Sequence, residues 1–225
     1  MKRFLRPVVV SYGHFRRVVQ VLAVATAASL AFAPAQAATR PLRIVALGDS
    51  LTAGYGLPAG QAFPDALQRA LKADGVDVEI VNAGVSGDTA AGGLARLDWS
   101  VPEGSDALIV ELGANDMLRG FDPGETEKSL AQILDKARAA HLPTLLTGMR
   151  AAPNLGLDYQ HRFDAIYPEL ASRYGVALYP FFLEGVAGDP RLNQTDGLHP
   201  NREGVGLIVK AMLPTVEAFL AGIKR

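Results

Sequence analysis

The chain has 225 residues, of which 49% are hydrophobic and 20% are charged. This composition fits one soluble globular domain and excludes an intrinsically disordered chain. The formal net charge of −1 gives no basis for nucleic acid as a partner, and the absence of cysteine excludes a thiol nucleophile, a disulfide and a thiolate metal site.

The N-terminal segment has the pattern of a secretory signal. Residues 1–37 carry five basic residues and no acidic one, and an apolar stretch at residues 18–34 leads to the small-x-small sequence Ala35-Gln36-Ala37. We therefore expect a cleaved signal peptide at residues 1–37 and a periplasmic or secreted protein, whose net charge after cleavage would be −6. A membrane anchor is the alternative, although the stretch is short and rich in alanine for a span of roughly 20 residues. An arginine pair leaves both Sec and twin-arginine export open.

From residue 43 onward, apolar runs of strand length alternate with helix-like segments. Strands are expected at residues 43–48, 78–82, 107–113, 144–148 and 176–178. Helices are expected from Phe63 to about Gly75, within residues 86–97, from Asp122, over residues 159–174 and after Pro200. This order predicts a single α/β domain whose parallel sheet is covered by helices on both faces. The active site of such a sheet lies beyond the carboxyl ends of the strands.

Ser50 follows the first predicted strand and enters a glycine-rich turn. A serine hydroxyl needs a base within hydrogen-bond reach, and the base needs an orienting group. His199 comes three residues after Asp196, with Gly197 between them to allow a turn. Of the other histidines, His14 lies in the expected signal segment, His141 is placed to cap the C-terminus of a helix, and His161 has no acidic partner in a comparable loop. We therefore interpret Ser50, His199 and Asp196 as nucleophile, base and orienting group, with a turn-forming serine and a surface Asp–His pair as the alternatives.

Acyl transfer also needs hydrogen-bond donors for the developing oxyanion. The glycine-bearing loop at residues 84–88 offers backbone N–H groups, and Asn115 offers a side-chain amide. Both follow predicted strands, so we expect them at the same edge of the sheet as Ser50. The alternative for Asn115 is that it only closes a turn.

Four blocks occur in the order that is typical of the SGNH (GDSL) hydrolases. They are Gly48-Asp49-Ser50-Leu51, Ser86-Gly87-Asp88-Thr89, Gly113-Ala114-Asn115-Asp116 and Asp196-Gly197-Leu198-His199-Pro200. Stretches between the blocks also look similar: residues 92–97, 118–121, 165–168 and 180–182. The chain resembles this family, and within it the bacterial periplasmic thioesterases, lysophospholipases and arylesterases. Residues 38–225 are accordingly expected to form a single hydrolase domain.

The resemblance implies a flavodoxin-like three-layer α/β/α sandwich with a five-stranded parallel sheet. It implies Ser50 as the nucleophile, His199 as the general base and Asp196 as its orienting group. The oxyanion hole would consist of the backbone N–H groups of Ser50 and Gly87 together with the Asn115 side chain. No metal and no organic cofactor are expected.

The expected activity is hydrolysis of carboxylic esters and thioesters through an acyl-enzyme. The partner would be a small-molecule acyl or aryl ester or thioester, with no nucleic acid and no stable membrane insertion after cleavage, and the protein would be a monomer. Five apolar side chains near the post-strand loops indicate a shallow groove for the acyl or aryl group: Leu118, Phe121, Leu155, Leu157 and Phe182. The alternative is that they are ordinary core residues.

Three other functions remain as alternatives. A carbohydrate acetylesterase would share the triad, but the single tryptophan and the lack of an appended carbohydrate-binding domain disfavour it. Nucleotide binding rests only on the glycine-rich loop at residues 54–60, which misses the dinucleotide spacing by one residue and lacks a P-loop lysine. A non-catalytic binding protein on a hydrolase scaffold is disfavoured because every expected chemical group is present.

Overall fold

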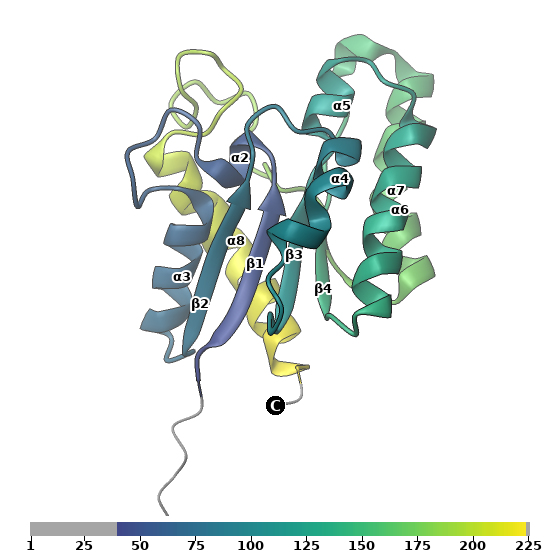
Figure 1. Ribbon diagram of the computed structural model, residues 1–225. Helices are drawn as coiled ribbons and strands as arrows, with labels where there is room; N and C mark the ends of the chain where they lie inside the picture. The colour runs from purple at the N-terminus through teal and green to yellow at the C-terminus, as the bar shows by residue number, and fades with distance from the viewer. Residues whose placement is uncertain (1–39, 224–225) are drawn as a thin grey trace, which may run out of the picture. The chain divides into compact units, whose positions relative to one another are not determined.

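The computed structural model describes residues 40–223, so the predicted signal segment at residues 1–37 lies outside the described residues. Among the described residues, five strands form one parallel sheet in the order β2-β1-β3-β4-β5 (Figure 1). They are β1 (Leu42–Gly48), β2 (Val78–Gly84), β3 (Ala107–Glu111), β4 (Thr144–Thr147) and β5 (Ala177–Tyr179). The direction in which strands are added reverses between β1 and β3, and open α/β sheets bind ligands at such a switch point.

The carboxyl ends of the three strands around this switch point lie level with one another. Gly48, the last residue of β1, pairs with Gly84 of β2 and with Glu111 of β3. β1 and β3 are buried along almost their whole length, whereas the edge strand β2 is partly exposed. Because Ser50 comes two residues after Gly48, it lies at the same edge as the loops that follow β2 and β3.

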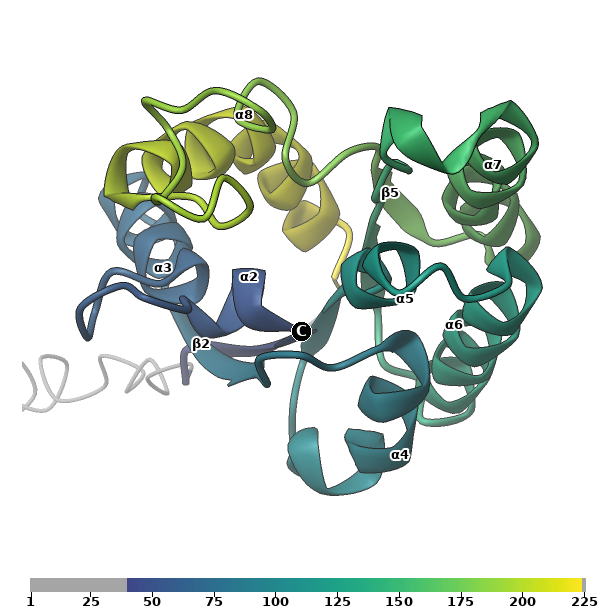
Figure 2. The same cartoon turned by 90° about the horizontal axis from the view of Figure 1, so that it is seen from above.

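Helices cover both faces of the sheet (Figure 2). On one face, α3 (Phe63–Ala73) packs against α8 (Arg202–Ala221). On the other face, α6 (Pro123–Ala139) packs against both α4 (Ala90–Ser100) and α7 (Leu157–Tyr174). The three layers and the strand order are those of a flavodoxin-like α/β/α sandwich, which confirms the predicted fold class.

The start of α6 shows how local sequence fixes the elements. Asp122 caps the helix by accepting a hydrogen bond from Gly124 N over 2.8 Å, and Pro123 takes the first helical position. The predicted apolar face of this helix is buried: Leu130, Ile133, Leu134 and Ala137. The spacing of apolar residues therefore predicted both the helix and the face that it buries.

Short helices next to the site were not predicted. α2 (Ser50–Ala53) and α5 (Ala114–Leu118) each follow a strand almost directly, and a 3₁₀ turn, η1 (Pro153–Leu155), precedes α7. These segments are too short to show the 3.6-residue periodicity on which the prediction of a helix depends.

The C-terminal helix α8 is apolar because it belongs to the core. Among residues 40–223 it is the one helix that is long and apolar enough to cross a membrane. Its buried residues, which include Val205, Ile208 and Met212, belong to the same apolar cluster as the central strands. Packing against β5 and α3 buries these residues.

Candidate active site

Ser50 is the first residue of α2 and stands in a turn held by buried groups. Asp49 caps this helix, and its carboxylate accepts a hydrogen bond from Leu51 N over 2.9 Å. The Asp49 side chain is fully buried, whereas Ser50 lines a pocket. A side chain at Gly48 would place its Cβ 2.7 Å from the carbonyl oxygen of Glu111, so the end of β1 requires glycine. The turn therefore presents the Ser50 hydroxyl from a tightly packed support.

The His199 imidazole joins Ser50 to Asp196. Its Nε2 lies 2.8 Å from Ser50 Oγ, and its Nδ1 lies 2.7 Å from Asp196 Oδ2. Asp196 Oδ1 also accepts hydrogen bonds from the backbone N–H groups of Leu198 and His199. These backbone bonds, together with the His199 side chain, lower the pKa of Asp196 to about 2. Asp196 is therefore ionised at neutral pH and favours a proton on Nδ1, which leaves Nε2 to accept the Ser50 proton.

The loop that carries His199 is attached to the loop after α2. The Gln194 side-chain amide donates to the carbonyl of Tyr55 over 2.7 Å and to the carbonyl of Pro200 over 3.1 Å. The Tyr55 ring lies 4.7 Å from the His199 ring between centroids. Gly56 has a φ of +73° and packs so closely on Gln194 that a Cβ would collide with it. Support of the histidine explains this glycine-rich loop without a bound nucleotide.

All three predicted oxyanion donors line the same pocket. The backbone N–H of Ser50 belongs to the first turn of α2, where N–H groups have no partner inside the helix. Gly87 has a φ of +88°, a conformation that favours glycine. Asn115 on α5 donates one Nδ2 hydrogen to Asp49 Oδ2 over 3.0 Å. Its second Nδ2 hydrogen is then available to a ligand.

Two arginines that were not predicted from the sequence hold the glycine-bearing loop at residues 84–88, which we call the oxyanion loop. Arg96 on α4 is 6% exposed; its guanidinium pairs with the Asp88 carboxylate and donates to the Gly48 carbonyl over 2.8 Å. Arg119, just after α5, donates to the Gly87 carbonyl over 2.8 Å. Arg96 thus joins the end of β1 to the oxyanion loop, and Arg119 joins that loop to α5. Both arginines fall in stretches that resemble the family, which was the only signal for them in the sequence.

Asp116, the last residue of the third block, connects helices. Its carboxylate accepts hydrogen bonds from Ala90 N over 2.8 Å and from Thr126 Oγ1 over 3.2 Å. Burial raises the pKa of Asp116. Asp116 therefore ties the start of α4, which follows the oxyanion loop, to α5 and α6.

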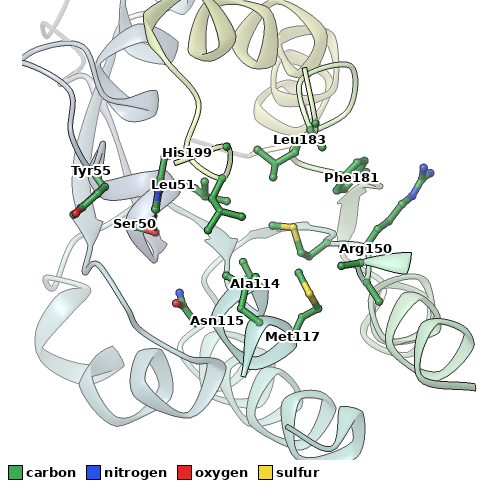
Figure 3. Close-up of a pocket in the computed structure, with 18 of the residues that line it drawn as sticks. Ser50, Leu51, Tyr55, Ala114, Asn115, Met117, Arg150, Phe181, Leu183 and His199 are labelled. Atoms are coloured by element: carbon green, nitrogen blue, oxygen red, sulfur yellow. Dashed lines mark hydrogen bonds between the residues drawn. The ribbon is translucent and has the colours of Figure 1, made fainter. Parts of the chain in front are cut away.

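A mostly apolar pocket of about 780 Å³ opens beside Ser50. Figure 3 shows Ser50, Tyr55 and His199 at one side of the pocket and Phe181 and Arg150 at the other. Between them lie further apolar side chains, which include Leu51, Met117 and Leu183, and Met149 also lines the pocket. The pocket is therefore a channel that leads away from the nucleophile along the sheet edge toward the ends of β4 and β5.

Only part of the predicted groove lines this pocket. Leu118 does. Phe182 does not: it is 1% exposed and its ring packs edge-on against Phe63 at 4.9 Å, so it is a core residue and the prediction for it is wrong. Its neighbour Phe181 lines the pocket instead. The other three lie outside the pocket lining: Phe121, Leu155 and Leu157. Phe121 and Leu157 are exposed to solvent, and Leu155 packs against the core.

The arrangement supplies the groups that acyl transfer requires at one place. A hydroxyl, an imidazole and a carboxylate form a hydrogen-bonded chain, and neutral donors and an apolar channel lie beside the hydroxyl. Within residues 40–223, no three His, Cys, Asp or Glu side chains are grouped as a metal site would need.

Comparisons with known proteins agree with this geometry. The model of the GDSL-like Lipase/Acylhydrolase family matches residues 46–207. Esterase TesA of Pseudomonas aeruginosa is 42% identical over 82% of this chain and 92% of its own length. Thioesterase 1/protease 1/lysophospholipase L1 of Escherichia coli K12 is also 42% identical, over 79% of this chain and 84% of its own. The crystal structure of AlinE4, an SGNH-hydrolase family esterase, is 48% identical, covers 81% of this chain and 98% of its own, and has a TM-score of 0.68.

Proposed function

The chain belongs to the GDSL-like lipase/acylhydrolase family and is a carboxylic ester hydrolase, and on that premise we propose that Ser50, His199 and Asp196 are its catalytic triad. The observation that carries this proposal is the pair of hydrogen bonds on His199, 2.8 Å to Ser50 and 2.7 Å to Asp196. All three groups and the oxyanion donors come from one chain, which supports a monomer as the active species.

In the first half of the reaction, Ser50 Oγ attacks the acyl carbonyl carbon while His199 Nε2 takes the hydroxyl proton. The carbonyl oxygen becomes an oxyanion, which the N–H groups of Ser50 and Gly87 and the Asn115 amide stabilise. Asp196 stabilises the imidazolium that forms. The tetrahedral intermediate collapses, the bond to the leaving alcohol or thiol breaks, and His199 donates its proton to that leaving group.

In the second half, water replaces the leaving group. His199 Nε2 takes a proton from the water as its oxygen attacks the acyl carbon of the Ser50 ester. The same donors hold the second oxyanion. Collapse of this intermediate returns the proton to Ser50 Oγ and releases the carboxylic acid.

The chain hydrolyses carboxylic esters and thioesters, as the names of its relatives indicate. We propose that a linear acyl group or an aryl group of the substrate occupies the pocket beside Ser50. Met117, Leu118, Phe181 and Leu183 provide apolar contact there, and each buried methylene would contribute about 0.8 kcal/mol. This lining favours an acyl chain over a glycan, which needs polar partners around its hydroxyl groups.

We also propose that the enzyme is exported and acts in the periplasm or outside the cell. The support is the order of the basic, apolar and small-residue segments within residues 1–37. N-terminal sequencing of the exported protein would test this: a mature chain that begins after Ala37 is expected, and a chain that keeps Met1 would contradict it.

The function is tested by hydrolysis of p-nitrophenyl esters from acetate to palmitate and of an acyl-CoA. The mature wild type is compared with Ser50→Ala and with Ser172→Ala, an exposed serine of α7, as the matched control. We expect Ser50→Ala to lose at least about 10³-fold in kcat and Ser172→Ala to keep wild-type activity. Full activity in Ser50→Ala would contradict the triad. Activity on acetyl-xylan with none on longer esters or acyl-CoA would favour a carbohydrate acetylesterase.

A further inference from the structure

Two carboxyl groups are buried directly behind the nucleophile turn. Asp49 is 0% exposed, and Glu111, the last residue of β3, is 1% exposed. A Cβ at Gly48 would lie 2.7 Å from Glu111 Oε2, so the glycine leaves room for this carboxyl group. The proposed proton transfers use neither carboxyl, and two adjacent charges in such a site would repel each other strongly.

Glu111 is poorly equipped to carry a negative charge. Its Oε2 accepts a hydrogen bond from Thr52 Oγ1 over 2.8 Å and lies 3.4 Å from Asp49 N. Its Oε1 is buried and has no hydrogen-bond partner among the described residues. Burial raises the pKa of Glu111 well above its usual value, and the nearby Asp49 charge raises it further. A side-chain hydrogen bond between Glu111 and Asp49 also raises the pKa of Glu111 and lowers that of Asp49, so it favours the proton on Glu111 and the charge on Asp49.

Asp49 is the better place for the charge. Its carboxylate accepts full hydrogen bonds from Leu51 N over 2.9 Å and from Asn115 Nδ2 over 3.0 Å. Burial raises the pKa of Asp49 to about 6, and these bonds and the charge of His199 act in the opposite direction. Of the two carboxyl groups, Asp49 is therefore the one that carries the negative charge.

We propose that Glu111 is an uncharged positioning residue, which holds the nucleophile turn through Thr52 and leaves a single negative charge on Asp49 to orient the oxyanion donor Asn115. Its role in the reaction rests on the function proposed above for Ser50 and Asn115, but its charge state does not. If Glu111 were charged as well as Asp49, its negative charge would lie behind the oxyanion that the site must stabilise. The repulsion between the two would weaken that stabilisation.

Other ionisable groups surround the pair. On α4, Arg96 donates to the carbonyl of Gly48, the residue before Asp49. On α7, the buried phenol of Tyr167 donates to the Leu112 carbonyl, and the nearby carboxylates help burial to raise its pKa. His199 acts on Asp49 from the other side. The positive charges of Arg96 and of a protonated His199 favour the single negative charge on Asp49. A test of Glu111 must therefore leave Arg96, Tyr167 and His199 unchanged.

Thermal unfolding as a function of pH tests the charge state, with Glu111→Gln as the variant. A carboxyl whose pKa is raised by folding contributes stability that is fully present below its unfolded pKa and is lost as pH rises toward the folded value. Glu111→Gln cannot undergo this loss. We expect its Tm relative to wild type to increase by roughly 3–5 °C for each pH unit as pH rises above about 5.

Glu169→Gln, an exposed glutamate of α7, is the matched control, and its Tm difference from wild type should not change with pH. A constant difference for Glu111→Gln as well would mean that Glu111 is ionised in the folded protein, which would overturn the proposal. This readout does not depend on catalysis. An inactive wild type with the expected slope would contradict the proposed function and still support the uncharged Glu111.

Activity tests the positioning role. Glu111→Ala removes the acceptor for Thr52, and we expect kcat to fall about 10-fold to 100-fold with a smaller change in KM. Glu111→Gln keeps an uncharged acceptor and should restore most of this loss. If Glu111→Gln is folded and as impaired as Glu111→Ala, the site needs a charge at this position and the proposal is wrong.

Discussion

Asn115 Nδ2 donates to Asp49 Oδ2 over 3.0 Å, although 66 residues separate the two in the chain. Only the amino group of a side-chain amide can donate to a carboxylate, so this bond decides which way the Asn115 amide is turned. It also joins α5, which follows β3, to the turn that carries Ser50. The nucleophile and a proposed oxyanion donor are thus held by one buried carboxylate.

Replacement of Asn115 by alanine is expected to lower kcat by about 10²–10³-fold with little change in KM, because an oxyanion donor acts mainly in the transition state. Steady-state kinetics on a p-nitrophenyl ester measures this. Asn115→Asp, which would put a second carboxylate against Asp49, should be at least as slow. A loss of less than about threefold in folded Asn115→Ala would show that Asn115 only closes a turn.

Replacement of Asp196 by asparagine is expected to lower kcat by roughly 10⁴-fold, because the amide can donate to Nδ1 and favours the wrong imidazole tautomer. The pH dependence of stability should change too. The pKa of Asp196 is lowered to about 2 in the folded protein, so its contribution to stability is present above the unfolded pKa of about 3.9 and is lost as pH falls toward 2. The Tm of wild type should therefore approach that of Asp196→Asn between about pH 5 and pH 2.

Asp189→Asn provides the control for this pair of effects. Arg191 lowers the pKa of Asp189 to about 2 as well, through a side-chain hydrogen bond, and Asp189 does not line the pocket. Its variant should therefore show the same convergence of Tm in acid while it keeps wild-type kcat. Equal losses of activity in both variants would mean that Asp196 acts through the charge of the loop rather than through His199.

Replacement of Arg119 by alanine is expected to lower kcat about 10-fold and to leave KM and Tm nearly unchanged. The Arg119 guanidinium holds the Gly87 carbonyl over 2.8 Å in an exposed position, so its loss frees the oxyanion loop without a cavity in the core. Arg119→Lys, which keeps one donor, should recover part of the activity. The comparison is Arg173→Ala, a surface arginine paired with Glu127 between α6 and α7, which should behave as wild type. If Arg119→Ala and Arg173→Ala have the same kcat, Arg119 is only a surface residue.

The sheet and the predicted triad were accessible from the sequence for physical reasons. Buried parallel strands are short apolar runs, and the polar residues after them must gather at one edge of the sheet. Ser50 and His199 are 149 residues apart, yet both lie in loops at that edge, and the structure brings their side chains within 2.8 Å. The spacing from Asp196 to His199 also allows the backbone bonds that orient the carboxylate.

The supporting residues were not accessible in the same way. Arg96 and Glu111 act through tertiary contacts with the Gly48 carbonyl and Thr52, and no local spacing indicates such contacts. The prediction of the groove residues was partly wrong for a related reason. Phe181 and Phe182 are chemically identical neighbours, and their tertiary contacts distinguish them: Phe182 packs on Phe63, whereas Phe181 lies under Arg150 and lines the pocket.

The difference between the predicted groove and the observed pocket gives a test of where the acyl chain binds. Leu183 lines the pocket, whereas Leu157 is 72% exposed and lies outside the pocket lining. Leu183→Ala should lower kcat/KM for octanoate more than for acetate, because only the longer chain reaches the apolar contact. Loss of contact with two or three methylenes, at about 0.8 kcal/mol each, corresponds to roughly 10-fold to 60-fold. Leu157→Ala, the same substitution outside the channel, should leave the octanoate-to-acetate ratio unchanged. If Leu157→Ala shifts the ratio and Leu183→Ala does not, the acyl chain follows the groove predicted from the sequence and not the pocket beside Ser50.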